Sequence, residues 1–364
     1  MSTEIQIEGK KFLINGKPTY EGVTYRGQPI EGLLFNSRMV QAIFDDENPE
    51  TVDNWRYPDT GEWDPDRNTD EFCQMLPTYR RYGLLAVTVG LQGGGSIYEP
   101  EVYDHYINTA FAPDGSLKPA YVDRMERVLD AADEVGMVVI VNYFYWRQLN
   151  KLNDDDAIRR ATNEATDWLL RAGHRNILVD LMNEFQVGDG LLQSKNIHQL
   201  IEAVQQITLN GRRLLVSSSV HPENFLPDGR WQRVQDFYLP HGNNVWADEL
   251  RVKLQELKMS DAFQENPRPI VVNEDSIHVD SLEAAIDEYA SWGYYSQGYG
   301  CGGRWKHGRF DWLAKEREDG YEDLSGFQTV PVNWSLNTER KREFFERLAK
   351  ITQSPGAADR ASSD

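Results

Sequence analysis

Short runs of apolar residues alternate with longer amphipathic stretches between about residue 36 and residue 352. Several of these runs are nearly continuous, as at 138–141 and 177–182, which is typical of parallel strands that are buried on both faces. The pattern predicts eight strands, at 39–44, 84–91, 137–143, 177–182, 213–218, 236–239, 269–273 and 293–297.

The amphipathic stretches between these runs predict helices. The polar residues 68–71 resemble a capping box that opens a helix ending near residue 82. Pro119 suits the first position of the next helix, because the fixed φ of proline is compatible with a helix start. The fifth unit is the weakest, because residues 220–235 are rich in Pro, Gly and Trp and show no clear helix. Further helices are expected at about 154–172, 195–210, 247–261, 281–291 and 338–352.

Eight strands that alternate with helices form either a closed barrel or a doubly wound sheet, and the count of eight favours the barrel. We therefore predict a single α/β domain, a (β/α)₈ TIM barrel over residues 1–353. A short N-terminal β-hairpin cap is expected at about residues 1–30, where Asn15-Gly16 marks a tight turn. Long loops should follow strands two and eight, and the polar tail 354–364 is predicted to be disordered.

Composition narrows the classes of partner. The net charge of −20 argues against nucleic acid and anionic membranes, which attract basic surfaces. No apolar run approaches the roughly 18 residues of a membrane span, and the first residues lack the apolar segment of a signal peptide. Cys73 and Cys301 form no metal-binding spacing. We expect a cytoplasmic protein without metal or cofactor; homo-oligomers are compatible with the sequence, which does not specify one.

Two predicted strands end in acidic residues. The fourth continues into Asn183-Glu184, and the seventh into Asn273-Glu274-Asp275. Barrels carry their active sites at the carboxyl ends of the strands. Retaining cleavage of a glycosidic bond needs two carboxyl groups about 5–5.5 Å apart. The pattern therefore indicates this chemistry.

These two strand ends resemble clan A of the glycoside hydrolases, which are retaining (β/α)₈-barrel enzymes. The resemblance implies that Glu184 is the acid/base, Glu274 the nucleophile, and Asn183 a ligand of the sugar 2-hydroxyl. Asp275 remains a competing candidate for the nucleophile. Because two close carboxylates repel, one should stay protonated near neutrality, and we expect a raised pKa for Glu184. The activity should then show a bell-shaped pH profile.

Other strand ends and the last loop supply polar and aromatic groups suited to a sugar. The candidates for substrate contact are Arg38, Gln92, Tyr145, His241, Asn243 and Trp305. The substrate class expected is a short oligosaccharide or glycoside, cleaved by exo action; neither the sugar nor the linkage follows from the sequence.

Two other classes stay open. A metal-dependent barrel hydrolase would usually carry His-x-His on its first strand, and residues 39–44 contain no histidine. A non-catalytic carbohydrate-binding barrel would keep the aromatic rim and lose one carboxylate, whereas this chain keeps both Glu184 and Glu274.

Overall fold

The computed structural model describes residues 2–94, 105–187, 190–243, 245–298 and 320–356. Its centre is a curled sheet of seven parallel strands in the order β10-β9-β8-β7-β6-β14-β13. The strands are β6 (Asn36–Arg38), β7 (Ala86–Gly90), β8 (Val138–Tyr145), β9 (Ile177–Asn183), β10 (Leu215–Ser217), β13 (Val271–Val272) and β14 (Ser291–Tyr294).

Two short strands link the edges of this sheet. β11 (Ser219–Val220) follows β10 after one residue and pairs in parallel with β12 (Leu239–Pro240). On the other side of β12, the N–H of Val271 donates to the C=O of Tyr238 at 2.8 Å. These bonds connect β10 to β13 through β11 and β12, as in a TIM-like barrel.

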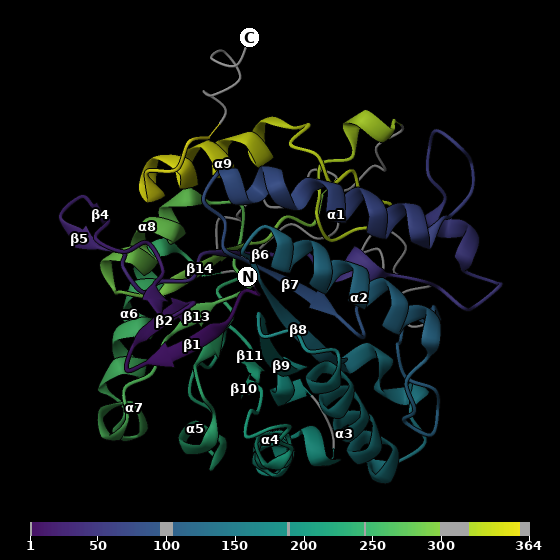
Figure 1. Cartoon of the computed structure of the whole chain (residues 1–364), viewed down its shortest axis with the longest axis horizontal. Helices are drawn as coiled ribbons and strands as arrows, with labels where there is room; N and C mark the ends of the chain where they lie inside the picture. Colours follow the sequence, from purple (N-terminus) through teal and green to yellow (C-terminus); the bar gives the residue numbers. More distant parts are fainter. Residues whose placement is uncertain (1, 95–104, 188–189, 244, 299–319, 357–364) are drawn as a thin grey trace.

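Helices lie around the strands (Figure 1). They are α1 (Pro65–Arg81), α2 (Pro119–Glu134), α3 (Asp155–Arg171), α4 (Ile197–Gln206), α5 (Trp231–Val234), α6 (Ala247–Met259), α7 (Asp261–Glu265), α8 (Val279–Asp287) and α9 (Glu339–Thr352). Short 3-10 turns are η1 (Val40–Ile43), η2 (Val52–Trp55), η4 (Trp146–Lys151), η5 (Phe185–Val187), η6 (Gly190–Leu192) and η7 (Tyr321–Asp323). Within the described ranges, no helix is both long enough and apolar enough to cross a membrane.

The first predicted strand is wrong in its position. Residues 39–44 were expected to be extended, but the strand β6 ends at Arg38 and η1 follows. All four residues of η1 are buried, so their apolar character cannot distinguish a buried strand from a buried helical turn. The side chains of Asn68 and Thr69 donate to the C=O of Ala42. This carbonyl therefore has hydrogen-bond partners without pairing to a neighbouring strand.

The start of α1 also differs from the predicted capping box. The N-cap is Asp64, whose carboxylate accepts from the N–H groups of Asp66 and Arg67, and Pro65 is the first helical residue. The polar residues 68–71 lie inside the helix, where Asn68 is fully buried against η1. A buried tertiary role for Asn68 therefore produced a pattern that resembles a cap.

The N-terminal segment forms an antiparallel sheet of β1 (Ile5–Glu8), β2 (Lys11–Ile14) and β3 (Lys17–Pro18). Between β2 and β3, Asn15 and Gly16 both have positive φ, as a tight hairpin turn requires. The N–H of Ile5 donates to the C=O of Arg175, just before β9 begins. The sheet thus lies at the end of the barrel where the strands start, near the chain terminus marked N in Figure 1. A separate small hairpin joins β4 (Thr24–Tyr25) to β5 (Gln28–Pro29).

The inside of the barrel is apolar at the end where the strands begin and polar toward their carboxyl ends. Phe12 and Phe237 belong to a buried cluster with Leu34, Ile140 and Leu178. Within a strand, the side chain two residues after Leu34, Ile140 or Leu178 points to the same face, into the barrel. At that level, fully buried polar side chains form a layer: Asn36, Thr88, Asn142, Asp180, Ser217 and Asn273. This polar layer lies between the apolar end and the carboxyl ends of the strands.

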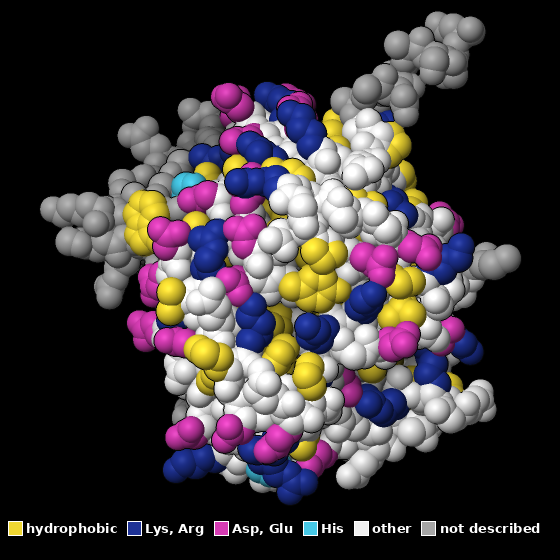
Figure 2. Space-filling model, turned by 90° about the vertical axis from the view of Figure 1, so that its left-hand side faces the viewer, with side chains coloured by type: hydrophobic (Ala, Val, Ile, Leu, Met, Phe, Trp, Pro, Cys, Tyr) yellow, Lys and Arg dark blue, Asp and Glu magenta, His cyan; other side chains and the backbone are white. Residues whose placement is uncertain are grey.

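On the face that carries β4, β5 and α8, acidic and basic side chains are interspersed (Figure 2). Arg26 pairs with Glu283 at 2.6 Å and Arg251 with Asp287 at 2.7 Å on α8. Beyond α9, the N–H of Gly356 donates to the C=O of Arg81, so the beginning of the predicted tail packs against α1. Residues 357–364 of that tail lie outside the described residues.

Candidate active site

Glu184 lies directly after β9 with its backbone in the left-handed region, at φ 52°. Few residues other than glycine adopt this conformation, and those that do concentrate at functional sites. The turn directs the end of strand four toward β11, where the N–H of Glu184 donates to the hydroxyl of Ser219 at 3.1 Å. Asn183, just before it, is the last residue of β9 and is buried.

Glu274 and His241 come from adjacent strands. His241 follows β12 directly and forms a parallel bridge with Glu274, two residues beyond β13. The N–H of Gly242 donates to the C=O of Glu274 at 2.7 Å. This backbone pairing places the His241 ring beside the Glu274 carboxylate.

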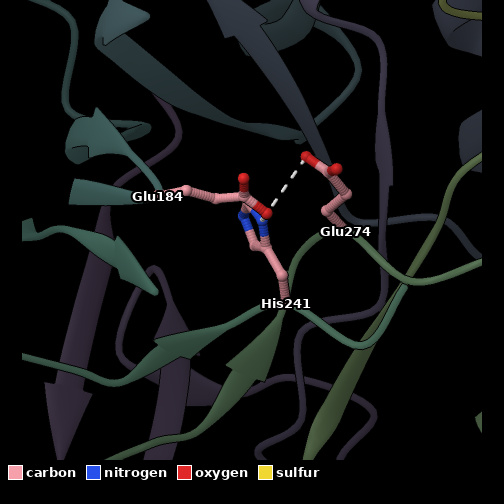
Figure 3. A group of neighbouring side chains, drawn as sticks. All are labelled: Glu184, His241 and Glu274. Atoms are coloured by element: carbon pink, nitrogen blue, oxygen red, sulfur yellow. Dashed lines mark hydrogen bonds and ion pairs between the residues drawn. The ribbon is translucent and has the colours of Figure 1, made fainter. Parts of the chain in front are cut away.

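The three side chains converge, with His241 between the two glutamates (Figure 3). Its Nδ1 lies 3.0 Å from Oε1 of Glu184 and 3.6 Å from Oε2 of Glu274. One ring nitrogen of His241 and one oxygen of each carboxylate all lie within 4.8 Å of one another. Such closeness suits a retaining mechanism, because inverting enzymes hold their carboxyl groups about 6.5–9.5 Å apart.

Two further side chains hold Glu274. Nε of Arg38 forms an ion pair with its Oε2 at 2.5 Å, and the amide of Asn243 donates to its Oε1 at 2.5 Å. Arg38, Asn243 and Glu274 are all buried. The guanidinium of Arg38 also donates to the side-chain oxygen of Asn183, so it orients residues from strands four and seven together.

The expected raised pKa of Glu184 is contradicted for the protein without substrate. Burial raises this pKa, but the hydrogen bond and positive charge of His241, together with the charges of His221 and Arg38, outweigh burial and leave it lowered. Burial lowers the pKa of His241, and the charges of Glu274 and Glu184 overcome that effect and raise it. The sequence could not place the imidazole between the carboxylates, so it suggested simple repulsion between them.

The other residues predicted to contact substrate differ in their positions. Tyr145 pairs with Asn183 across β8 and β9 and is half-buried at the carboxyl end of the barrel. Gln92 is fully buried: its amide donates to Thr109 at 2.9 Å and accepts from the N–H of Tyr145 at 3.0 Å. Gln92 thus supports the strand that carries Tyr145 instead of facing the carboxylates. Trp305 lies outside the described residues.

Asp275 does not join the carboxylate pair. Its side chain is fully buried and packs against the backbone of Gly242, where an added Cβ would lie 2.2 Å from its Oδ2. The group of acidic and histidine side chains that meets at the site contains Glu274 and not Asp275. The geometry therefore favours Glu274 over Asp275 as the carboxylate that faces Glu184.

Sequence reasoning missed two groups near Arg38. Tyr295 follows β14 directly and is buried, and Asp180 is fully buried on β9. Both act electrostatically on Arg38 and raise its pKa, against the opposing effect of burial. The position of Tyr295 at a strand end could have identified it as a candidate from the sequence. Asp180 lies within an apolar strand, where no sequence pattern indicates the site.

Glu184, His241 and Glu274 could also hold a metal ion, and within the described ranges they are the one such group. The positive guanidinium of Arg38 already lies against Glu274, and Nδ1 of His241 already bonds to Glu184. Both contacts compete with a cation for the same atoms, so they favour the metal-free interpretation.

The fold is similar to that of solved glycoside hydrolases. A GH5-4 broad specificity endoglucanase from Clostridium longisporum matches with a TM-score of 0.54 and 10% identity, covering 88% of this chain and 96% of that one. A provisionally assigned glycoside hydrolase from Bacteroides vulgatus matches with a TM-score of 0.51 and 10% identity, covering 96% of this chain and 61% of that one. The sequence matches no family model and no curated protein. The chain has the barrel fold of these glycoside hydrolases, as its resemblance to clan A implies.

Proposed function

We propose that this protein is a retaining glycoside hydrolase, with Glu274 as nucleophile and Glu184 as acid/base. The observation that carries the proposal is the convergence of the two carboxylates within 4.8 Å at the carboxyl ends of strands four and seven. A non-catalytic binding barrel has no need of a second carboxylate at this distance, nor of cations that hold both.

The reaction would proceed by double displacement. Glu274 attacks the anomeric carbon while Glu184 gives a proton to the departing glycosidic oxygen, and a covalent glycosyl ester forms. Glu184 then removes a proton from a water molecule, and the water attacks the anomeric carbon and releases Glu274. Arg38 and Asn243, which contact Glu274, orient its carboxylate for the attack.

His241 supplies the proton in this scheme. Its pKa is raised and it bonds to Glu184 through Nδ1 at 3.0 Å, so the proton lies on a hydrogen bond that leads to the acid/base. Transfer along that bond leaves a neutral imidazole and a protonated Glu184, the form that a general acid requires. The lowered pKa of Glu184 without substrate is then compatible with its role.

Asn183 and Tyr145 are proposed to contact the sugar, together with Trp305. Exo action on a short oligosaccharide or glycoside remains a prediction, as do the cytoplasmic location, the domain limit at residue 353 and any homo-oligomer. One structure of similar fold is named an endoglucanase, so polysaccharides belong among the substrates tested.

The test is a panel of aryl glycosides and β-linked polysaccharides, assayed at pH 5 to 8 with and without a metal chelator. We expect hydrolysis that the chelator leaves unchanged and that Glu274→Gln reduces by at least about 10³-fold. Tight sugar binding without turnover would identify the binding barrel, and loss of activity with chelator would identify the metal-dependent hydrolase.

A further inference from the structure

The backbone of Glu184 needs support from its surroundings. Its φ of 52° belongs to the left-handed region, which a side chain other than glycine keeps only where neighbouring groups hold it. The direction of its side chain depends on this conformation. A group that fixes the backbone therefore fixes where the carboxyl meets His241.

Ser219 makes that contact. Its hydroxyl accepts from the N–H of Glu184 at 3.1 Å and donates to the C=O of Met182 at 3.1 Å. One hydroxyl thereby bonds to the residues on both sides of Asn183, and Ser219 is fully buried. The bond holds the turn at the end of strand four against strand five.

Ser219 is itself fixed by strand four. Its backbone N–H donates to Oδ1 of the fully buried Asp180 at 2.8 Å. The next residue, Val220, accepts at its C=O from the N–H of His241 at 3.0 Å. The side chain of Asp180 thus holds the backbone of Ser219, and the side chain of Ser219 holds the backbone of Glu184.

From these contacts we propose that Ser219 is a positioning residue for the acid/base Glu184. Ser219 positions the Glu184 carboxyl group against Nδ1 of His241. It does not position Glu274, because no contact of Ser219 with Glu274 is found among the described residues. The catalytic part of this inference rests on the proposed function.

Ser218 provides the matched control. It is also fully buried, and its hydroxyl accepts from the N–H of Met182 at 3.1 Å and donates to the same C=O at 3.0 Å. Among the described residues, the side-chain hydrogen bonds of Ser218 reach Met182 and not Glu184. Ser218→Ala therefore removes the same kind of hydroxyl from the same strand crossing without freeing the acid/base.

The experiment compares Ser219→Ala with Ser218→Ala on glycosides whose leaving groups differ in pKa. A misplaced acid harms substrates that need protonation and spares activated ones. In Ser219→Ala we expect kcat/KM to fall about 10- to 100-fold for a poor leaving group and less than about 3-fold for a dinitrophenyl group. Equal losses on both substrates, or the same pattern in Ser218→Ala, would overturn the proposal.

Amide hydrogen exchange tests the contact without any substrate. Ser219→Ala should speed exchange at the Glu184 amide, and Ser218→Ala should speed it at Met182 alone. Unchanged exchange at Glu184 in Ser219→Ala would refute the contact. If the wild type hydrolyses no glycoside while exchange at Glu184 responds, the proposed function fails and the contact stands.

Discussion

At the residue scale, the site balances two carboxylates against two cationic groups. Glu274 lies against Arg38, Glu184 against His241, and His241 reaches both glutamates. All four side chains have little exposure, so their mutual charges are weakly screened by solvent. The protonation of the acid/base Glu184 therefore depends on the imidazole of His241.

Replacing the imidazole should move the alkaline limb of the activity profile. In His241→Gln the cation leaves while burial of Glu184 remains, so the pKa of Glu184 rises. In the wild type the proton that Glu184 needs is held by His241, whose raised pKa sets the alkaline limb. In the variant Glu184 must hold that proton itself, and even with this rise a carboxyl group loses its proton at lower pH than the imidazole. We expect the alkaline limb of kcat/KM to shift downward. His174→Asn, at a partly buried histidine that pairs with Asp130, is the control. An upward shift or no shift in His241→Gln would contradict the assignment.

Asp180 should make stability depend on pH. Burial raises its pKa to about 6, from 3.8 for an ordinary Asp. Well below pH 3.8 the group is protonated in both folded and unfolded chains and does not affect stability. As pH rises from 4 to 6 the unfolded chain ionises first, so folded stability is lost, by up to about 3 kcal/mol above pH 6.

The variant Asp180→Asn removes this cost and keeps an oxygen for the Ser219 N–H. Urea unfolding at pH 4 and pH 8 measures the effect. We expect the free energy of unfolding of the variant, relative to wild type, to be more favourable at pH 8 by up to about 3 kcal/mol. The same difference at both pH values would show that Asp180 does not titrate as described.

At the element scale, the sequence predicts most strands because burial on both faces leaves uninterrupted apolar runs. β8 and β9 are found where those runs predict them. β6 is missed because its residues, Asn36, Ser37 and Arg38, are polar and belong to the polar interior. The strand ends predict that Glu184 and Glu274 meet at one end of the barrel, whereas their roles come only from the resemblance to clan A. The support by Ser219 and the burial of Gln92 depend on contacts between strands, which no local pattern contains.

The N-terminal sheet should matter for stability and not for catalysis. Phe12 on β2 is fully buried beside Phe237, with ring centroids 6.1 Å apart, at the end of the barrel away from the site. Phe12→Ala should lower the free energy of unfolding by about 3–5 kcal/mol. Its kcat, measured well below the melting temperature, should match wild type. Lys17→Ala, at an exposed position of β3, controls for the sheet. A fall in kcat for Phe12→Ala would link the two ends of the barrel.

At the scale of the whole molecule, fold and function rest on different evidence. Structural similarity to solved glycoside hydrolases, at only 10% identity, supports the barrel fold, which many unrelated activities share. The proposed activity rests on the carboxylate pair and its two cations. A net charge of −20 leaves the substrate class open, because it neither attracts nor repels neutral sugars.

The most direct test of the account is covalent labelling of the nucleophile. Once a substrate is known, a fluorosugar with a good leaving group should trap the glycosyl ester, and mass spectrometry should find the label on Glu274. Glu274→Ala should take no label, and azide should restore some turnover with inverted product. A label on Asp275, or hydrolysis with inversion by the wild type, would contradict the proposed mechanism.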